Sequence, residues 1–75
     1  MYILGKGYGY QQDSFGNILV RREEDSAEVY LQGDDANLLR AELNALDAIE
    51  YPCGPFQNYE EHLDVILGQY DTVMQ

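Results

Sequence analysis

The stretch GKGYGY, residues 5–10, has the residue types of a phosphate-binding loop. In nucleotide sites, a strand leads through such a glycine loop into a helix whose first amides hold the phosphate. Here the glycines alternate with side chains, neither Ser nor Thr follows Lys6, and the next segment has the pattern of a strand. The sequence therefore favours a structural interpretation. Gly5, Gly7 and Gly9 would leave one face of a strand bare for a close neighbour, or would mark a bulge.

The only cysteine and the only histidine are the residues that nucleophilic catalysis would need. Cys53 lies between Pro52 and Gly54, nine residues before His62 in a predicted helix. Nothing in the sequence indicates an oxyanion hole or a shaped pocket beside them. We therefore interpret them as a half-buried thiol and a surface imidazole, and expect no catalytic residues. A single cysteine also excludes an internal disulfide, and there is no Cys/His set for zinc.

Dense carboxylates could in principle bind a metal ion. Residues 23–25 (EED) and 34–35 (DD) are the densest, but neither follows the calcium-loop spacing with its central glycine and terminal glutamate. We interpret the first as a solvated turn and the second as the start of a helix. No cofactor and no metal are expected.

The charge balance is the strongest compositional signal. The chain has 14 acidic and 4 basic residues, a net charge of −10, and residues 41–75 hold seven acids with neither Lys nor Arg. Such a chain repels nucleic acid and anionic membranes and is attracted to basic surfaces. Direct nucleic-acid binding is therefore not expected. A second interpretation is that the acidity serves solubility alone.

Seven residues form the predicted partner-binding site. Acids of the second predicted helix lie near one another, and those four residues apart stand about 6 Å from each other, a spacing similar to that of phosphates along a nucleic acid. Acids near the end of the first helix would support them, and an exposed tyrosine would serve as an anchor. The predicted residues are Glu60, Glu61, Asp64, Asp71, Asp47, Glu50 and Tyr30. The alternative is an ordinary solvated helix face.

These residues must be positioned by strands that precede helices. Alternating patterns predict strands over 2–12, 18–23 and 27–32, joined by turns at 13–17 and 24–26. In the first strand, the side chains of even-numbered residues, Tyr2, Leu4, Tyr8 and Tyr10 among them, would share one face. Ile18, Val20, Val29 and Leu31 would point inward.

Two amphipathic helices complete the prediction. The first is capped by Asp34 or Asp35 and buries Leu39, Leu43 and Leu46, with Leu38 and Ala45 widening the stripe. The prolines in residues 51–56 end it. The second begins after Asn58, in a capping box with Glu61, and continues to Val73 or Met74. The predicted fold is α+β, one domain over residues 1–75, with a three-stranded antiparallel sheet followed by two helices on one of its faces.

The chain resembles a class of small inhibitors. In size, in its lack of a cofactor motif and in the acidic half EYPCGPFQNYEEHLDVILGQYD, it is similar to the acidic single-domain proteins of phages and mobile elements: anti-CRISPR, anti-restriction and other DNA-mimic proteins. The resemblance implies a non-enzymatic protein that docks on the basic nucleic-acid-binding surface of a partner. It also implies the cytoplasm of a bacterium or phage-infected host. The sequence shows no signal peptide and no apolar run of the roughly 20 residues that a membrane span needs.

The alternative hypothesis is a structural subunit without an inhibitory role. A small core and tyrosine-rich strands could be completed by a symmetric dimer formed through the outer faces of the strands. Tyr8 and Tyr30 would then lie in the interface.

Overall fold

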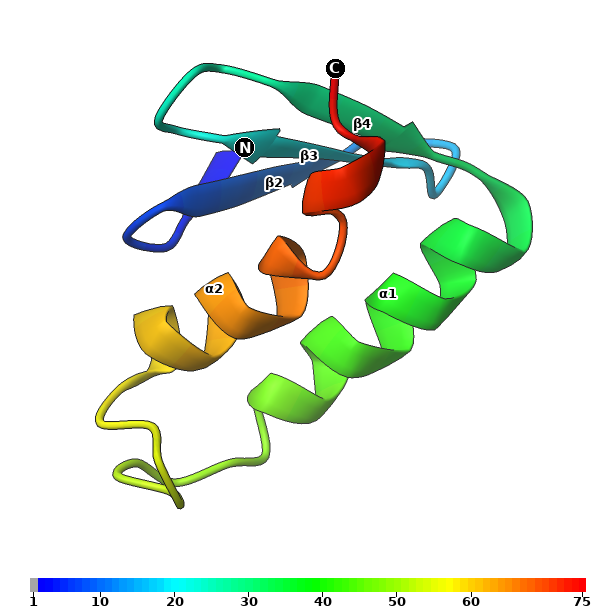
Figure 1. Ribbon diagram of the computed structural model, residues 1–75. Helices are drawn as coiled ribbons and strands as arrows, with labels where there is room; N and C mark the ends of the chain where they lie inside the picture. The colour runs from blue at the N-terminus through cyan, green and yellow to red at the C-terminus, as the bar shows by residue number, and fades with distance from the viewer. Residues whose placement is uncertain (1) are drawn as a thin grey trace.

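The computed structural model describes residues 2–75. An antiparallel sheet formed by the N-terminal part of the chain is covered by the helices that follow it (Figure 1). The strands lie in chain order across the sheet: β1 (Tyr2–Leu4), β2 (Tyr8–Gln12), β3 (Ile18–Arg22) and β4 (Glu28–Leu31). The helices are α1 (Gly33–Leu46), α2 (Tyr59–Gly68) and the short 3₁₀ helix η1 (Asp71–Val73). The predicted α+β class is confirmed, but the sheet has four strands rather than three.

The predicted strand 2–12 is two strands joined by a tight turn at residues 5–7. The Gly5 N–H donates to the Tyr8 carbonyl over 2.7 Å, which closes the turn. The Asp64 carboxylate, from α2, accepts hydrogen bonds from the backbone N–H groups of Lys6 and Gly7. The alternating pattern predicted one strand because the glycines and the lysine continue it. The carboxylate that holds the turn is distant in sequence, so the local pattern could not indicate the turn.

This turn changes which residues share a face of the sheet. Ile3 pairs with Tyr10, and Leu4 pairs with Gly9. Paired residues lie on the same side of a sheet, so Leu4 and Tyr2 lie on the face opposite Tyr8 and Tyr10. The prediction that these four side chains share one face was therefore wrong.

The β2–β3 turn agrees with its prediction. Asp13 Oδ1 accepts hydrogen bonds from the N–H groups of Phe15 (2.8 Å) and Asn17 (3.0 Å). Gly16 has a φ of +85°, a conformation that glycine adopts without strain. Strands β3 and β4 begin and end within one residue of their predicted bounds, and Ile18, Val20 and Leu31 are buried as predicted.

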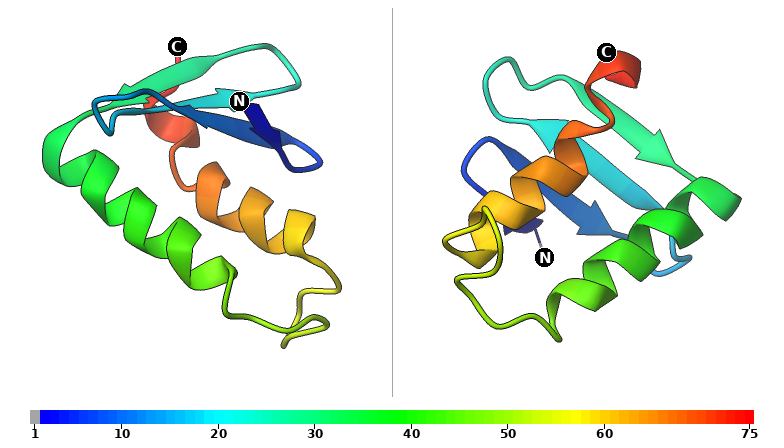
Figure 2. Two further views of the ribbon diagram at one scale, coloured as in Figure 1. Left: turned by 180° about the vertical axis from the view of Figure 1, so that it is seen from behind. Right: turned by 60° about the horizontal axis from the view of Figure 1, so that its bottom comes forward.

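Both helices cover the same face of the sheet, as the two further views show (Figure 2). In α1, the predicted stripe of Leu39, Leu43 and Leu46 is buried. Leu38 is 63% exposed, because the buried stripe is narrower than predicted. Ala45 is also exposed. The N-cap is Gln32, without a side-chain bond, so the cap predicted at Asp34 or Asp35 was wrong. These two acids instead lie in the first turn, where the helix dipole favours them.

Helix α2 begins as predicted and ends early. The Asn58 side chain accepts a hydrogen bond from the Glu61 N–H over 3.0 Å, which confirms the cap. The helix ends at Gly68 rather than at residue 73 or 74, because glycine is a poor helix former. Asp71 therefore belongs to η1 and not to α2.

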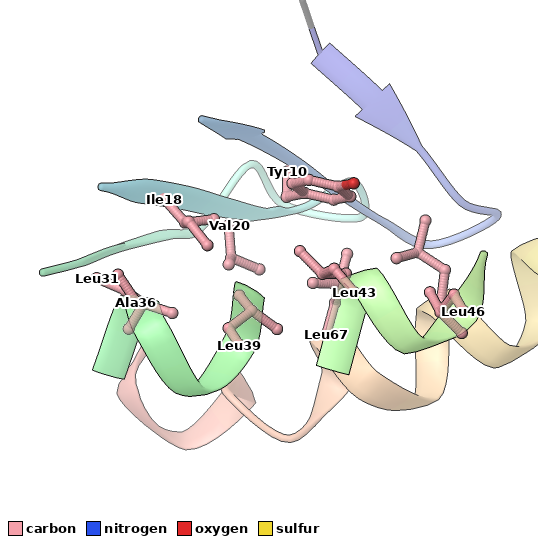
Figure 3. Close-up of a cluster of buried hydrophobic side chains, with 10 residues drawn as sticks. Tyr10, Ile18, Val20, Leu31, Ala36, Leu39, Leu43, Leu46 and Leu67 are labelled. Atoms are coloured by element: carbon pink, nitrogen blue, oxygen red, sulfur yellow. The ribbon is translucent and has the colours of Figure 1, made fainter. Parts of the chain in front are cut away.

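The core lies between the sheet and the helices (Figure 3). Its fully buried side chains come from β3, α1 and α2. The largest of them are Ile18, Val20, Leu39, Leu46, Leu63 and Leu67. Helix α2 packs against β2 and α1. One face of the sheet is thus filled, and the opposite face carries no other element of the described chain.

Candidate protein-binding surface

The predicted acidic residues fall into two groups, those with internal partners and those without. Asp64 belongs to the first. Its two carboxylate oxygens lie 3.1 and 2.9 Å from the backbone nitrogen of Lys6. Both oxygens also lie 3.2 Å from the backbone nitrogen of Gly7. One oxygen lies 3.3 Å from the Tyr8 nitrogen. Consecutive N–H groups that converge on an anion form a nest. The glycine loop thus holds an anion, and that anion is the protein's own carboxylate.

Glu61 is bound beside the same loop. Its carboxylate accepts from the Gln57 N–H over 3.0 Å and pairs with the Lys6 ammonium over 3.4 Å. The pKa of the Glu61 carboxyl is lowered, mainly by the hydrogen bond from the Gln57 N–H and to a smaller extent by the Lys6 ammonium. Glu61 therefore stabilises the start of α2 and joins it to the β1–β2 turn.

Asp71 fastens η1 to the sheet. It accepts a hydrogen bond from the Tyr8 hydroxyl over 2.7 Å and pairs with Arg22 over 3.1 Å. The Tyr8 pKa is raised mainly by this bond, because deprotonation would place two anions together. Arg22 also pairs with Asp25 over 2.8 Å. Reversing the charge of Asp64 or Asp71 would therefore test the fold before it tested partner binding.

Asp47, Glu50 and Glu60 form the second group, which we call the acidic end. All three are exposed, and none of their carboxylates makes a hydrogen bond or ion pair with another residue among 2–75. Asp47 is the C-cap of α1, Glu50 follows it, and Glu60 lies in the first turn of α2. The end of α1 and the start of α2 lie at the same end of the molecule (Figure 1). Three unpaired carboxylates are therefore presented there.

The position of Asp47 is unfavourable for the helix that it caps. The C-terminal end of a helix carries a partial negative charge, which favours basic side chains. The last turn of α1 has none, and its C-cap is an aspartate. The helix end and the acids therefore add to the same negative potential.

All four basic residues of the protein are bonded internally. Lys6, Arg21 and Arg22 pair with acids. Arg40 donates to the Asn37 side chain and to the Gly16 carbonyl. Arg40 is thus hydrogen-bonded to neutral groups and not ion-paired, and no ion pair among residues 2–75 includes a residue of the acidic end.

Tyr30, the predicted anchor, lies on the face of the sheet away from the helices and is 51% exposed. Its hydroxyl donates to Asp13 over 2.6 Å, and this bond is the main reason that the Asp13 pKa falls to about 2. The cross-strand pairs place eight residues on this open sheet face. They are Tyr2, Leu4, Gly9, Gln11, Leu19, Arg21, Glu28 and Tyr30. The alternating patterns of residues 18–23 and 27–32 predict which side chains of β3 and β4 lie on this face. The patterns did not predict that Tyr2 and Leu4 lie there, because they did not indicate the turn at residues 5–7.

Cys53 and His62 have separate surroundings. The Cys53 thiol is exposed in the loop between the helices. His62 shares a hydrogen bond of 2.9 Å between its Nδ1 and the Tyr51 hydroxyl, and the Phe56 ring stacks on it with centroids 4.2 Å apart. The imidazole therefore acts as a packing centre for the loop. Among residues 2–75 there is no group of three His, Cys, Asp or Glu residues placed to hold a metal ion.

None of the described helices has the length and apolar character that a membrane crossing needs. Comparison of the chain with protein-family models, with curated proteins and with solved structures found no match.

Proposed function

We propose that the protein is a non-enzymatic binding module that docks its acidic end onto a basic surface of a partner protein. The observation that carries the proposal is the placement of Asp47, Glu50 and Glu60 at one end of the molecule, exposed and without internal partners. An exposed carboxylate of this kind can approach a Lys or Arg of a partner without first breaking an internal bond.

The local energetics support the same surface. Asp47 stands at the negative end of α1, where a basic residue would stabilise the helix. Residues that break a local rule without an internal compensation are typical of functional sites. Charges at the edge of an interface act mainly on the association rate and on its salt dependence. We therefore expect fast, salt-sensitive docking.

The partner that we propose is a nucleic-acid-binding protein, which the module would inhibit as a nucleic-acid mimic. Such partners carry clusters of Lys and Arg that neutralise phosphates. A surface with unpaired carboxylates and a net charge of −10 offers them a similar field. Among the predicted residues, Asp47, Glu50 and Glu60 would contact the partner, while Glu61, Asp64 and Asp71 would position the elements.

The test compares two triple variants with equal charge. Asp47→Lys/Glu50→Lys/Glu60→Lys reverses the acidic end, and Glu24→Lys/Asp34→Lys/Asp35→Lys reverses three other exposed acids without internal partners. Each changes the net charge by +6, from −10 to −4. Wild type and both variants are immobilised and exposed to a bacterial lysate, and circular dichroism confirms that all three are folded.

The expected result is a nucleic-acid-binding protein that wild type and the second variant retain and that the first variant loses. Added DNA or high salt should release it from wild type. Equal loss in both variants would mean that only net charge matters, and unchanged capture by the acidic-end variant would refute the proposed surface. If DNA does not displace the captured partner, the proposal of a docking module stands, but the proposal that it mimics nucleic acid is refuted.

A further inference from the structure

The open sheet face consists of two cross-strand rows. Tyr2, Gln11, Leu19 and Tyr30 form one row, and Leu4, Gly9, Arg21 and Glu28 form the other. The Tyr2 ring lies across the face. A Cβ placed on Gly9 would stand 2.5 Å from a carbon of this ring, and the Arg21 guanidinium lies 5.4 Å from its centroid. Gly9 thus provides the space in which the tyrosine lies flat.

The face exposes apolar side chains that no described element covers. Leu4 is 55% and Tyr30 51% exposed, and Leu19 is half-buried between its neighbours. The adjacent β2–β3 turn carries Phe15, which is 87% exposed. Aromatic residues with a polar tip are favoured in interfaces.

The face is electrically balanced on a protein that is otherwise strongly acidic. Its one base, Arg21, pairs with its one acid, Glu28, over 2.7 Å. Acids at its margins are held by tyrosine hydroxyls of the face: Asp13 by Tyr30 and Glu23 by Tyr2. The helices and the acidic end lie on the opposite side of the sheet (Figure 2). Within its eight residues, the face therefore carries no net charge.

We propose that the open sheet face binds the same face of a second copy of the chain in a twofold dimer. The Arg21–Glu28 pair makes the face self-complementary, because each copy offers one charge of each sign to the other. Face-to-face packing also keeps the two acidic ends on the outside. The dimer thus leaves the proposed docking surface accessible, and its existence does not depend on that function.

The available area indicates the strength of the contact. Four strands of three to five residues, with a rise of about 3.4 Å per residue and a spacing of about 4.8 Å, cover roughly 280 Å² in projection. Side chains raise the accessible area of such a face, and a pair of faces then falls below about 1,200 Å², the range of weak and reversible complexes. We therefore expect a dimer that forms and dissociates with concentration.

Sedimentation equilibrium of the full chain tests the proposal from about 10 μM to about 1 mM, a range that brackets weak affinities. Leu4→Gln/Tyr30→Gln should weaken dimerisation by about tenfold or more, because it removes apolar contacts without changing net charge. Leu38→Gln/Val65→Gln is the matched control, because these residues of α1 and α2 are 63% and 60% exposed. It should dimerise like wild type.

Salt and chemical shifts provide further measurements on wild type itself. Salt should strengthen the dimer, because it screens repulsion between two chains of net charge −10, and should weaken docking on a basic partner. Amide shifts that change with concentration should map to β1–β4 and the 13–17 turn. A wild type that stays monomeric overturns the proposal, as do concentration-dependent shifts on α1 and α2, or dissociation by the Leu38/Val65 control alone.

Discussion

At the scale of single residues, the Asp64 carboxylate explains what the glycine loop at residues 5–7 binds. A carboxylate can accept several hydrogen bonds, and here backbone N–H groups from three successive residues supply them. The bonds join α2 to the β1–β2 turn. The loop that the sequence offers as a phosphate cradle is thus used for tertiary structure, and Gly5 is the residue that admits the carboxylate.

Replacing Gly5 and Gly7 separately by alanine should distinguish their roles. A Cβ at Gly5 would overlap Asp64 Oδ1, whereas a Cβ at Gly7 would meet no atom within 4 Å. Gly5→Ala should lower the free energy of unfolding by about 1–3 kcal/mol, the usual cost of overpacking or a lost buried bond. Gly7→Ala should change it by less than about 0.5 kcal/mol. Urea denaturation measures both, and equal effects would contradict the assigned contact.

Acid sensitivity is a second prediction at this scale. Tyr30 and the turn amides hold the pKa of Asp13 at about 2, below the ordinary value of 3.8. Because the folded pKa is lowered, Asp13 contributes its stability above about pH 4 and loses it as the pH falls to about 2. Urea midpoints of wild type should fall in this window, and those of Asp13→Asn should fall less. Parallel curves for the two proteins would contradict the prediction.

At the scale of elements, the sequence predicts what depends on neighbours in the chain. The alternation of β3 and β4 and the stripe of α1 are local consequences of one buried face, and Asn58 caps α2 through a bond to Glu61 three residues on. The split of residues 2–12 depends on Asp64, so no local pattern could reveal it.

The candidate site shows the same division. Composition and spacing identified the acids, but their partners come from distant elements. Glu61 meets Lys6, and Asp71 meets Arg22, across 55 and 49 positions of the chain. Only the fold separates these carboxylates from Asp47, Glu50 and Glu60.

The early end of α2 leads to a prediction for Gly68. A Cβ there would lie 3.5 Å from the Tyr8 ring, an ordinary van der Waals contact, and the residue needs no positive φ. Gly68→Ala should therefore raise the free energy of unfolding, by about 0.5–1 kcal/mol, through helix propensity and reduced freedom of the unfolded chain. Thermal and urea unfolding measure the change. A lower stability would mean that the Tyr8–Asp71 contact does not tolerate the methyl group.

At the scale of the whole molecule, the layered fold separates two kinds of surface. The helices carry the acidic end on one side, and the balanced open sheet face lies on the other. We propose the first surface for a basic partner and the second for another copy of the chain. A dimer would present two acidic ends at once, which would increase avidity for a partner with two basic sites.

The net charge also makes a prediction about stability. With 14 acids against 4 bases, repulsion among carboxylates opposes the compact state, and salt screens repulsion. The internal ion pairs, such as Lys6–Glu61, are partly solvent-exposed and contribute little by comparison. The midpoint of thermal unfolding should therefore rise as NaCl increases from about 10 mM to about 150 mM, over which the Debye length falls from about 30 Å to about 8 Å.

The two triple variants serve as controls for this effect at low protein concentration, where the chain is monomeric. Both have a net charge of −4, so both should gain less from salt than wild type does. Asp47→Lys removes the unfavourable acid at the end of α1, whereas Asp34→Lys and Asp35→Lys remove favourable acids from its start. The acidic-end variant should therefore be the more stable of the two. A midpoint that falls with salt in wild type would mean that the ion pairs outweigh the repulsion.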